Sequence, residues 1–154
     1  MAERDPLDVT LTLIEDAPSP PDLDEEQLAA LAAFVLAAEE AGGPWDITVA
    51  LVDDARLQAL HRDFMGIDEP TDIMTFPADE AEPAVGGGGE MAISVDHART
   101  QAAAWGLTPA QEIRYLVVHG LLHLLGWRDE DEASRKHMLA RQDELIAGWQ
   151  DRVS

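Results

Sequence analysis

Residues 108–129 read Thr-Pro-Ala-Gln-Glu-Ile-Arg-Tyr-Leu-Val-Val-His-Gly-Leu-Leu-His-Leu-Leu-Gly-Trp-Arg-Asp, and this stretch carries the clearest structural signals of the chain. Thr108 can cap a helix, Pro109 suits its first position, and an acid follows in the first turn. The apolar run continues to about Leu125, where Gly126 can adopt a positive φ and end the helix. We therefore predict a long helix at the centre of the fold.

The segments on either side of this helix alternate between strand and helix patterns. Strands are expected at Leu7–Ile14, Ile47–Val52, Asp72–Phe76 and Met91–Val95, and further helices from Asp22 or Asp24 to Ala41 and over residues 53–64, 97–105 (capped by Asp96) and 132–149. Residues 78–89 are acidic and then glycine-rich, which favours a flexible connection. Without a repeat or a second core, we expect one α+β domain over residues 1–154, a small mixed sheet of about four strands with helices packed on it.

The composition narrows the class of protein. A chain of 154 residues is one ordinary domain, and the lack of cysteine excludes disulfides, iron–sulfur clusters and cysteine-based zinc sites. The longest apolar stretch, Leu28–Ala38, is far shorter than the ~20 residues of a membrane span. No basic segment precedes an apolar one at the N-terminus, so no signal peptide is expected. We expect a cytoplasmic protein without a membrane partner.

The charge is strongly acidic, with 31 acidic and 10 basic residues and a net charge of −21. Such a protein is repelled by nucleic acid at long range. The charge is uneven, because residues 1–55 hold 14 acids and one arginine, whereas residues 114–141 hold five bases and four acids. Screening over ~8 Å makes the local balance matter more than the total. Solubility or adaptation to high salt accounts for the acidity most simply.

His119 and His123 stand four residues apart, which places both imidazoles on one face of the helix. Zinc takes four ligands from nitrogen, oxygen or sulfur, and Asp129 follows the Gly126 turn at a spacing that can supply a third. The alternative is a pair of core or surface histidines, but unpaired polar rings among leucines cost free energy. We predict a divalent-metal site, with zinc as the expected ion, at the end of the central helix. Gly120 occupies the position where zinc proteases carry a glutamate base, which disfavours peptide hydrolysis.

Three motifs together resemble the YbeY family of rRNA-maturation endoribonucleases. Residues 119–127 follow the family pattern His-Gly-x-Leu-His-Leu-x-Gly-aromatic, residues 69–77 are similar to its Pro-Thr-Asp-Val-Leu-Ser-Phe-Pro, and residues 89–94 more weakly to its Gly-Asp-Ile-x-Ile-Ser. The resemblance implies a metal-dependent endoribonuclease that cuts single-stranded RNA in ribosomal RNA maturation and ribosome quality control. It also implies an α+β fold with the metal in a cleft, and ribosomal RNA and small-subunit ribosomal proteins as partners.

The chain departs from the family pattern at several positions. Asp129 stands where the family has its third histidine, and Arg128 where an aspartate precedes it. A carboxylate is a legitimate zinc ligand, but its charge weakens the Lewis acidity of the ion. Met65 stands where the family has a loop arginine suited to a phosphate, and Arg62, one turn earlier, is the candidate replacement for that phosphate contact. A further, mild departure is Glu90, where the family has aspartate.

Several other residues have two interpretations each, one functional and one structural. Thr71 and Asp72 are candidates for substrate binding in the cleft or simply form a turn and a strand start. Trp127 is a candidate for stacking on a base or packs in the core beside the turn. His137 is a reserve ligand or, like His61 and His97, a surface histidine.

No general base is evident in the sequence, so the catalytic residues are left unassigned. Two further functions stay open beside the nuclease. One is a ribosome-associated maturation factor with a structural metal and little nuclease activity, which Met65 and Asp129 favour. The other is a metal hydrolase, such as a protease, with another substrate.

Overall fold

The computed structural model describes residues 5–78 and 82–153. Along the chain the elements are β1 (Asp8–Glu15), α1 (Glu25–Ala38), β2 (Pro44–Val52), α2 (Asp54–Met65), β3 (Ile73–Pro77), β4 (Gly87–Ser94), α3 (Val95–Trp105), α4 (Pro109–Leu124) and α5 (Glu132–Val153). This confirms the predicted α+β class. Within the described residues, no helix combines the length and the apolar character needed to cross a membrane.

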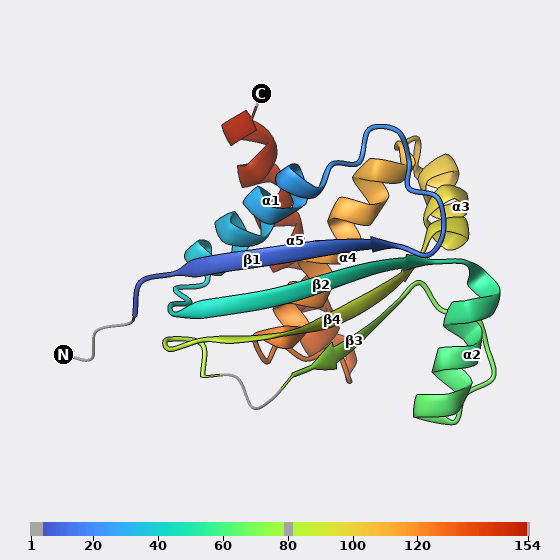
Figure 1. Cartoon of the computed structure of the whole chain (residues 1–154), viewed down its shortest axis with the longest axis horizontal. Helices are drawn as coiled ribbons and strands as arrows, with labels where there is room; N and C mark the ends of the chain where they lie inside the picture. Colours follow the sequence, from blue (N-terminus) through green and yellow to red (C-terminus); the bar gives the residue numbers. More distant parts are fainter. Residues whose placement is uncertain (1–4, 79–81, 154) are drawn as a thin grey trace.

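The four strands form one mixed sheet in the order β1-β2-β4-β3. The strands β1, β2 and β4 run parallel, and β3 pairs antiparallel with β4 at the edge. Along β2, alternate residues Trp45, Ile47, Val49 and Leu51 are buried on one face. The helices α1 and α4 pack on this face, α5 packs against these two helices, and all three share the core. The helix α4 contacts α1, α3, α5, β3 and β4. The helix predicted as central is therefore central (Figure 1).

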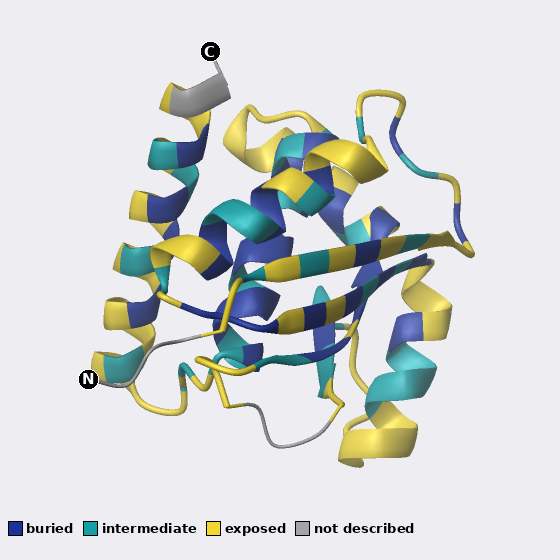
Figure 2. Ribbon diagram, turned by 60° about the vertical axis from the view of Figure 1, so that its left-hand side comes forward, coloured by how far each residue is buried: buried dark blue, intermediate teal, exposed yellow. Residues whose placement is uncertain are grey.

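The opposite face of the sheet carries a smaller apolar cluster beneath α2. Val52, Leu57, Met74 and Ala92 form this cluster, and α2 stands at one end of the sheet (Figure 1). Elsewhere exposed residues alternate with intermediate or buried ones along most of β1, and buried residues alternate with more exposed ones along most of β2, as Figure 2 shows. Because α4 contacts β3 from one side and α2 contacts it from the other, the edge strand β3 lies between these two helices.

Two local predictions were wrong. Gly87–Gly89, expected in a flexible connection, begin β4, where Gly88 pairs with Asp46 and a Cβ on Gly88 would lie 2.3 Å from the Asp46 carbonyl oxygen. Pairing on both sides thus orders a segment whose composition predicts a loop; residues 79–81 of that connection lie outside the described residues. The cap of α3 is Ser94, whose hydroxyl accepts from the His97 N–H, rather than Asp96.

Candidate metal centre and cleft

His119 and His123 lie one turn apart on the second half of α4. A complete capping box starts this helix, because the Thr108 hydroxyl accepts from the Gln111 N–H and the Gln111 side chain accepts from the Thr108 N–H. Buried leucines on the same helix fix its rotation against the sheet. The spacing then brings the two imidazoles together, with ring centroids 4.7 Å apart.

The chain reverses after α4 and brings Asp129 back to the two histidines. Gly126 has a φ of +99°, in the left-handed region that favours glycine, and the Trp127 N–H donates to the Leu122 carbonyl at 2.9 Å. The Trp127 indole N–H donates to the Glu39 carboxylate at 2.6 Å, which ties the turn to the end of α1. The returning loop is therefore anchored, and Asp129 follows it two residues later.

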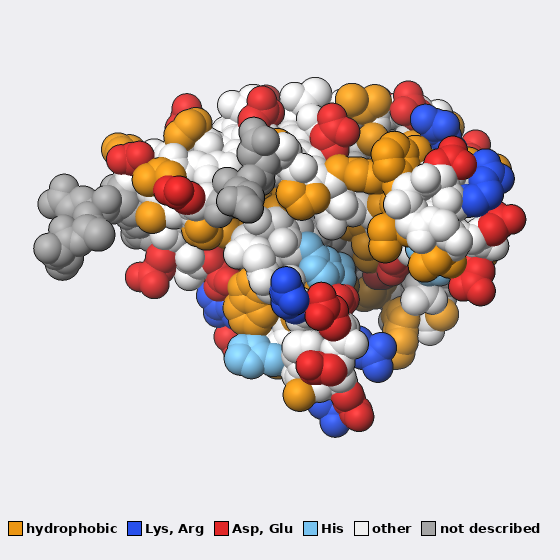
Figure 3. All heavy atoms as spheres, turned by 90° about the horizontal axis from the view of Figure 1, so that it is seen from below, with side chains coloured by type: hydrophobic (Ala, Val, Ile, Leu, Met, Phe, Trp, Pro, Cys, Tyr) orange, Lys and Arg blue, Asp and Glu red, His pale blue; other side chains and the backbone are white. Residues whose placement is uncertain are grey.

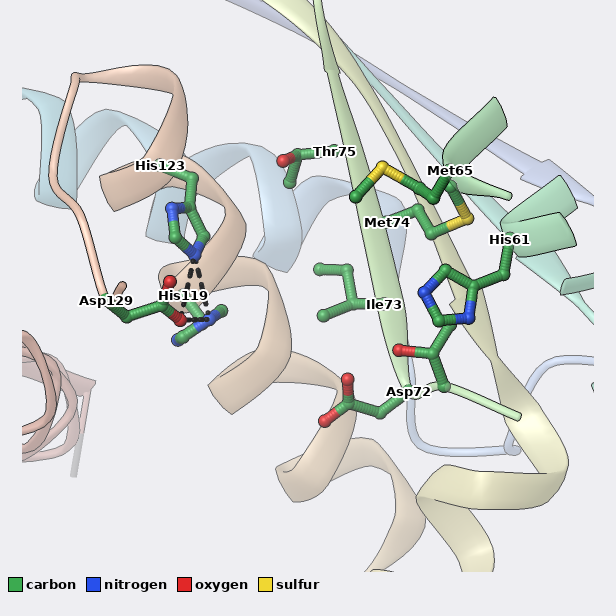
Figure 4. A pocket seen from close by; sticks show the side chains of 10 residues that line it. His61, Met65, Asp72, Ile73, Met74, Thr75, His119, His123 and Asp129 are labelled. Atoms are coloured by element: carbon green, nitrogen blue, oxygen red, sulfur yellow. Dashed lines mark hydrogen bonds and ion pairs between the residues drawn. The ribbon is translucent and has the colours of Figure 1, made fainter. Parts of the chain in front are cut away.

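Three ligand-type atoms converge at this point, as the dashed lines in Figure 4 mark. The Nε2 atoms of His119 and His123 are 3.1 Å apart. One Asp129 carboxylate oxygen, Oδ2, lies 3.6 Å from the first and 3.4 Å from the second. The side chains are 19%, 25% and 36% exposed respectively, so the cluster is partly shielded but reachable from solvent.

In each of the two imidazoles, the hydrogen bond made by Nδ1 determines which ring nitrogen carries the proton. His123 Nδ1 lies 3.1 Å from the Trp127 carbonyl oxygen, which can only accept, so Nδ1 donates. Gln142 donates its amide to the Tyr115 carbonyl at 3.0 Å, which leaves its side-chain oxygen to accept from His119 Nδ1 at 3.0 Å. Both Nε2 atoms therefore direct their lone pairs to the same point. In metal-binding histidines, the other ring nitrogen typically donates a hydrogen bond in this way.

Two lone pairs and a carboxylate oxygen at these distances repel one another unless a cation lies between them. Zinc–nitrogen and zinc–oxygen bonds of about 2.0–2.2 Å in a tetrahedral arrangement place ligand atoms roughly 3.4 Å apart. The three separations of 3.1, 3.4 and 3.6 Å bracket that value. Within the described residues, His119, His123 and Asp129 form a group that could bind a metal ion. The donor set fits the divalent ion that the sequence predicts.

A cleft with a volume of about 310 Å³ opens in front of this cluster. In Figure 4 the two histidines and Asp129 form one wall, while β3 and the end of α2 form the other. The lining residues of the second wall are His61, Met65, Thr71, Asp72, Ile73, Met74 and Thr75. In the space-filling view of Figure 3, a histidine borders a hollow on this face of the molecule.

The structure brings some of the other predicted residues to the cleft and not others. Thr71 and Asp72 line it. Arg62 is exposed, pairs with Asp63 at 3.2 Å and does not line the cleft, whereas Met65 does. Trp127 packs on the core and lines a different surface hollow, with its ring 5.0 Å from that of His137.

Sequence reasoning missed His61 as a site residue. His61 lies on α2, faces the cleft and holds its Nδ1 2.9 Å from the Glu69 carbonyl oxygen, so Nδ1 donates and Nε2 keeps its lone pair. Thr75, on β3, also lines the cleft. No spacing rule relates residue 61 to residue 119, and only the packing of α2 against β3 brings His61 there.

The electrostatics of the cleft are unusual for a nucleic-acid site. Among the described residues that line it, none is lysine or arginine, and two are aspartates. A bound cation would therefore supply the main positive charge that a phosphate meets there.

Comparison with known proteins defines the family. The sequence model described as "YbeY: Endoribonuclease YbeY" matches residues 14–150. The chain is 40% identical over 121 residues to the Endoribonuclease YbeY of Moorella thermoacetica, covering 73% of this chain and 78% of that protein. It is 36% identical to the protein of the same name from Cutibacterium acnes, over 83% and 87% of the two chains. This chain belongs to the YbeY family.

A solved structure supports the fold independently. The solution structure of TM1509 from Thermotoga maritima superposes with a TM-score of 0.61 and 23% sequence identity, and the match covers 93% of both chains. At this identity the likeness concerns the fold.

Proposed function

We propose that this chain, as one domain, is a metal-dependent endoribonuclease that cuts single-stranded RNA in ribosomal RNA maturation and ribosome quality control. The observation that carries the proposal is the convergence of two imidazole lone pairs and one carboxylate oxygen at the head of a cleft. The names of the relatives, Endoribonuclease YbeY, supply the reaction and the substrate class. Cytoplasmic localisation is the matching expectation.

His119, His123 and Asp129 would hold one divalent ion, with zinc as the best match to two nitrogens and one oxygen. Gln142 and the Trp127 carbonyl hold the two rings in the correct tautomer. When bound, the ion would supply Lewis acidity toward a phosphate oxygen and neutralise charge that develops during cleavage.

His61 is the proposed proton-transfer residue of the reaction. Its Nδ1 is fixed by the Glu69 carbonyl, so its Nε2 can accept or return a proton at a ribose or water oxygen in the cleft. In hydrolysis a water oxygen forms the new bond to phosphorus, the bond to one ribose oxygen breaks, and that oxygen takes up a proton. Thr71 and Thr75 line the same cleft, and their hydroxyls would donate to phosphate oxygens.

A second candidate function is a ribosome-associated maturation factor that uses a structural metal and has little nuclease activity. The specific observation in its favour is the cleft lining, in which the described residues include Met65 and no arginine or lysine. In that case the surface would bind small-subunit ribosomal proteins or ribosomal RNA without cutting it.

One experiment separates the two functions. We would measure the metal content of the purified protein and its cleavage of single-stranded and duplex RNA, for the wild type and for His123→Ala, with His137→Ala as the matched histidine control outside the cleft. The nuclease proposal expects about one bound ion and cleavage of single strands, both lost in His123→Ala and kept in His137→Ala. Bound metal without cleavage would favour the maturation factor, and the absence of bound metal would overturn both.

The role of His61 has its own test. His61→Ala should lower kcat by about 10²-fold or more, as expected for loss of a general acid or base, without changing the metal content. Added imidazole should restore part of the activity. Undiminished activity in His61→Ala would remove this residue from the mechanism and leave the metal site standing.

A further inference from the structure

A second and larger hollow adjoins the cleft behind His119. Its volume is about 750 Å³, within the range of small-molecule sites. It lies between the end of α3, the first half of α4 and α5, and it shares His119 and Asp72 with the cleft. The helices α3 and α4, which both contribute lining residues, lie side by side (Figure 1). A ligand in this hollow would therefore sit next to the proposed metal centre.

The hollow contains a nearly buried carboxylate, that of Glu112. Glu112 is only 9% exposed, and its backbone N–H donates to the Thr108 carbonyl, yet among the described residues its carboxylate has no hydrogen-bond or ion-pair partner. No buried side-chain oxygen of the described chain is both sealed from solvent and without a partner, so the Glu112 carboxylate must be reachable, and the hollow is where it is reached. Burial, and then the nearby Asp72 charge, raise the pKa of Glu112, and the nearby His97 offsets part of this rise. The carboxyl lacks the N–H donors that a buried acceptor ordinarily has.

The remaining walls favour a flat ring over a phosphate. Trp105 is 72% exposed at the rim, and Leu107 and Leu139 are exposed beside it. The described lining residues include Asp72, Glu112 and Asp143 but no lysine or arginine, which disfavours an anion. An exposed indole is a stacking surface for nucleobases, and carboxylates accept hydrogen bonds from base amino groups.

We propose that this hollow binds a guanine base of the RNA next to the phosphodiester that is cut. Guanine presents two adjacent N–H donors, N1–H and the N2 amino group, to the Glu112 and Asp72 carboxylates. Uracil offers one such donor and two carbonyls, which the carboxylates would repel. Gln101, which also lines the hollow, can donate its amide to the guanine carbonyl. This inference rests on the proposed nuclease function and adds a base preference to it.

The first test reads the base preference from cleavage. The full-length, metal-loaded protein would be given ten-nucleotide single strands of uridine that contain one guanosine, one adenosine or none, and the cut positions and rates would be mapped. We expect cleavage at a fixed offset from the guanosine, at least tenfold faster than in the all-uridine strand. Glu112→Gln should reduce that ratio about tenfold, and Trp105→Ala should raise KM where Trp105→Phe does not. Glu26→Gln, a remote exposed acid on α1, should leave the ratio unchanged.

The second test uses binding alone, so that failure of the nuclease function does not hide the result. Calorimetry with guanosine and uridine, which carry no phosphate, should show at least tenfold tighter binding of guanosine, and Glu112→Gln should remove the difference. If RNA is cut but neither test shows a preference for guanine, the base pocket is wrong and the nuclease function stands. If no RNA is cut yet guanosine binds, the nuclease function is wrong and the pocket stands. Displacement of guanosine by spermine at equal concentration would mark a general cation site and overturn the guanine proposal.

Discussion

Asp129 distinguishes this candidate metal centre from the pattern that the family motifs lead us to expect. Its carboxylate oxygen lies 3.4 and 3.6 Å from the two Nε2 atoms, in the position of a third ligand. Two neutral imidazoles and one carboxylate lower the net charge of the site by one unit relative to three imidazoles. An ion held in this way polarises a phosphate less strongly.

Substitution of Asp129 therefore tests whether it is a metal ligand and whether its negative charge lowers the activity of the bound ion. We expect Asp129→His to retain the metal and to raise kcat several-fold, because a neutral ligand leaves more positive charge on the ion. Asp129→Asn should weaken metal binding about tenfold or more, because a neutral amide oxygen is a poorer ligand than a carboxylate. Metal content and chelator competition would check both. Unchanged affinity in Asp129→Asn would show that the carboxylate is not a ligand.

Glu112 carries a stability cost that can be measured separately from any ligand. Burial raises its pKa above the ordinary value of 4.5, so the folded chain binds this proton more tightly than the unfolded chain does. Stability from this group is present at low pH and is lost as pH rises through the raised pKa. Glu112→Gln should thus melt close to the wild type near pH 4 and at a higher temperature at pH 8. Thermal melts across this range would show it, and a variant less stable at every pH would mean that the carboxylate has a native partner.

At the scale of elements, one carboxylate joins three parts of the chain around the metal loop. Glu39, just past the end of α1, accepts from the Trp127 indole at 2.6 Å and pairs with Arg141 of α5 at 2.8 Å. The loop that carries Asp129 is thereby tied to two helices. This explains why Trp127 serves the site through its backbone carbonyl and its anchor, whereas the proposed base stacking by this residue stays a prediction without support from its position.

Removing the hydrogen bond between Trp127 and Glu39 should weaken metal binding. Trp127→Phe keeps the aromatic packing but removes the N–H that Glu39 accepts from. We expect metal affinity to fall about tenfold, at the lower end of the effects seen when supporting contacts of ligands are removed. Competition with a chromophoric chelator would measure it. Trp149→Phe, a buried tryptophan on α5 away from the loop, is the matched control, and equal losses in both variants would argue for a general loss of stability.

The contrast between α4 and the far wall of the cleft shows what local signals can predict. The start of α4, its helical spacing and the Gly126 turn are encoded within about twenty residues, so His119, His123 and Asp129 could be placed together from the sequence. The far wall depends on α2 packing against the edge strand β3. Because no local sequence signal predicts this packing, the sequence alone indicates an ordinary surface histidine at His61. Gly87–Gly89 resemble a loop by composition, and only pairing with strands distant in the sequence makes them part of β4.

For the whole molecule, the net charge of −21 bears directly on how RNA could be held. Neither the cleft nor the adjoining hollow has a lysine or arginine among its described lining residues. Binding would then rest on the ion, on hydrogen bonds and on stacking, which release few counterions. Long-range repulsion between protein and RNA is also greatest at low ionic strength, where screening is weakest.

The salt dependence of KM for single-stranded RNA tests this view of the whole surface. Each phosphate neutralised by a basic side chain contributes a slope of about −0.7 to log affinity against log salt for single strands. With one contact or none, we expect KM to change by less than about threefold between 50 and 200 mM salt. A loss of 10³-fold would instead require about seven contacts at this slope. In that case the basic residues Arg135 and Lys136, which are exposed on α5, are the candidates for these phosphate contacts. The double variant Arg135→Gln, Lys136→Gln should leave both KM and its slope unchanged if the cleft alone holds the RNA, and should flatten a steep slope if this helix binds the phosphates.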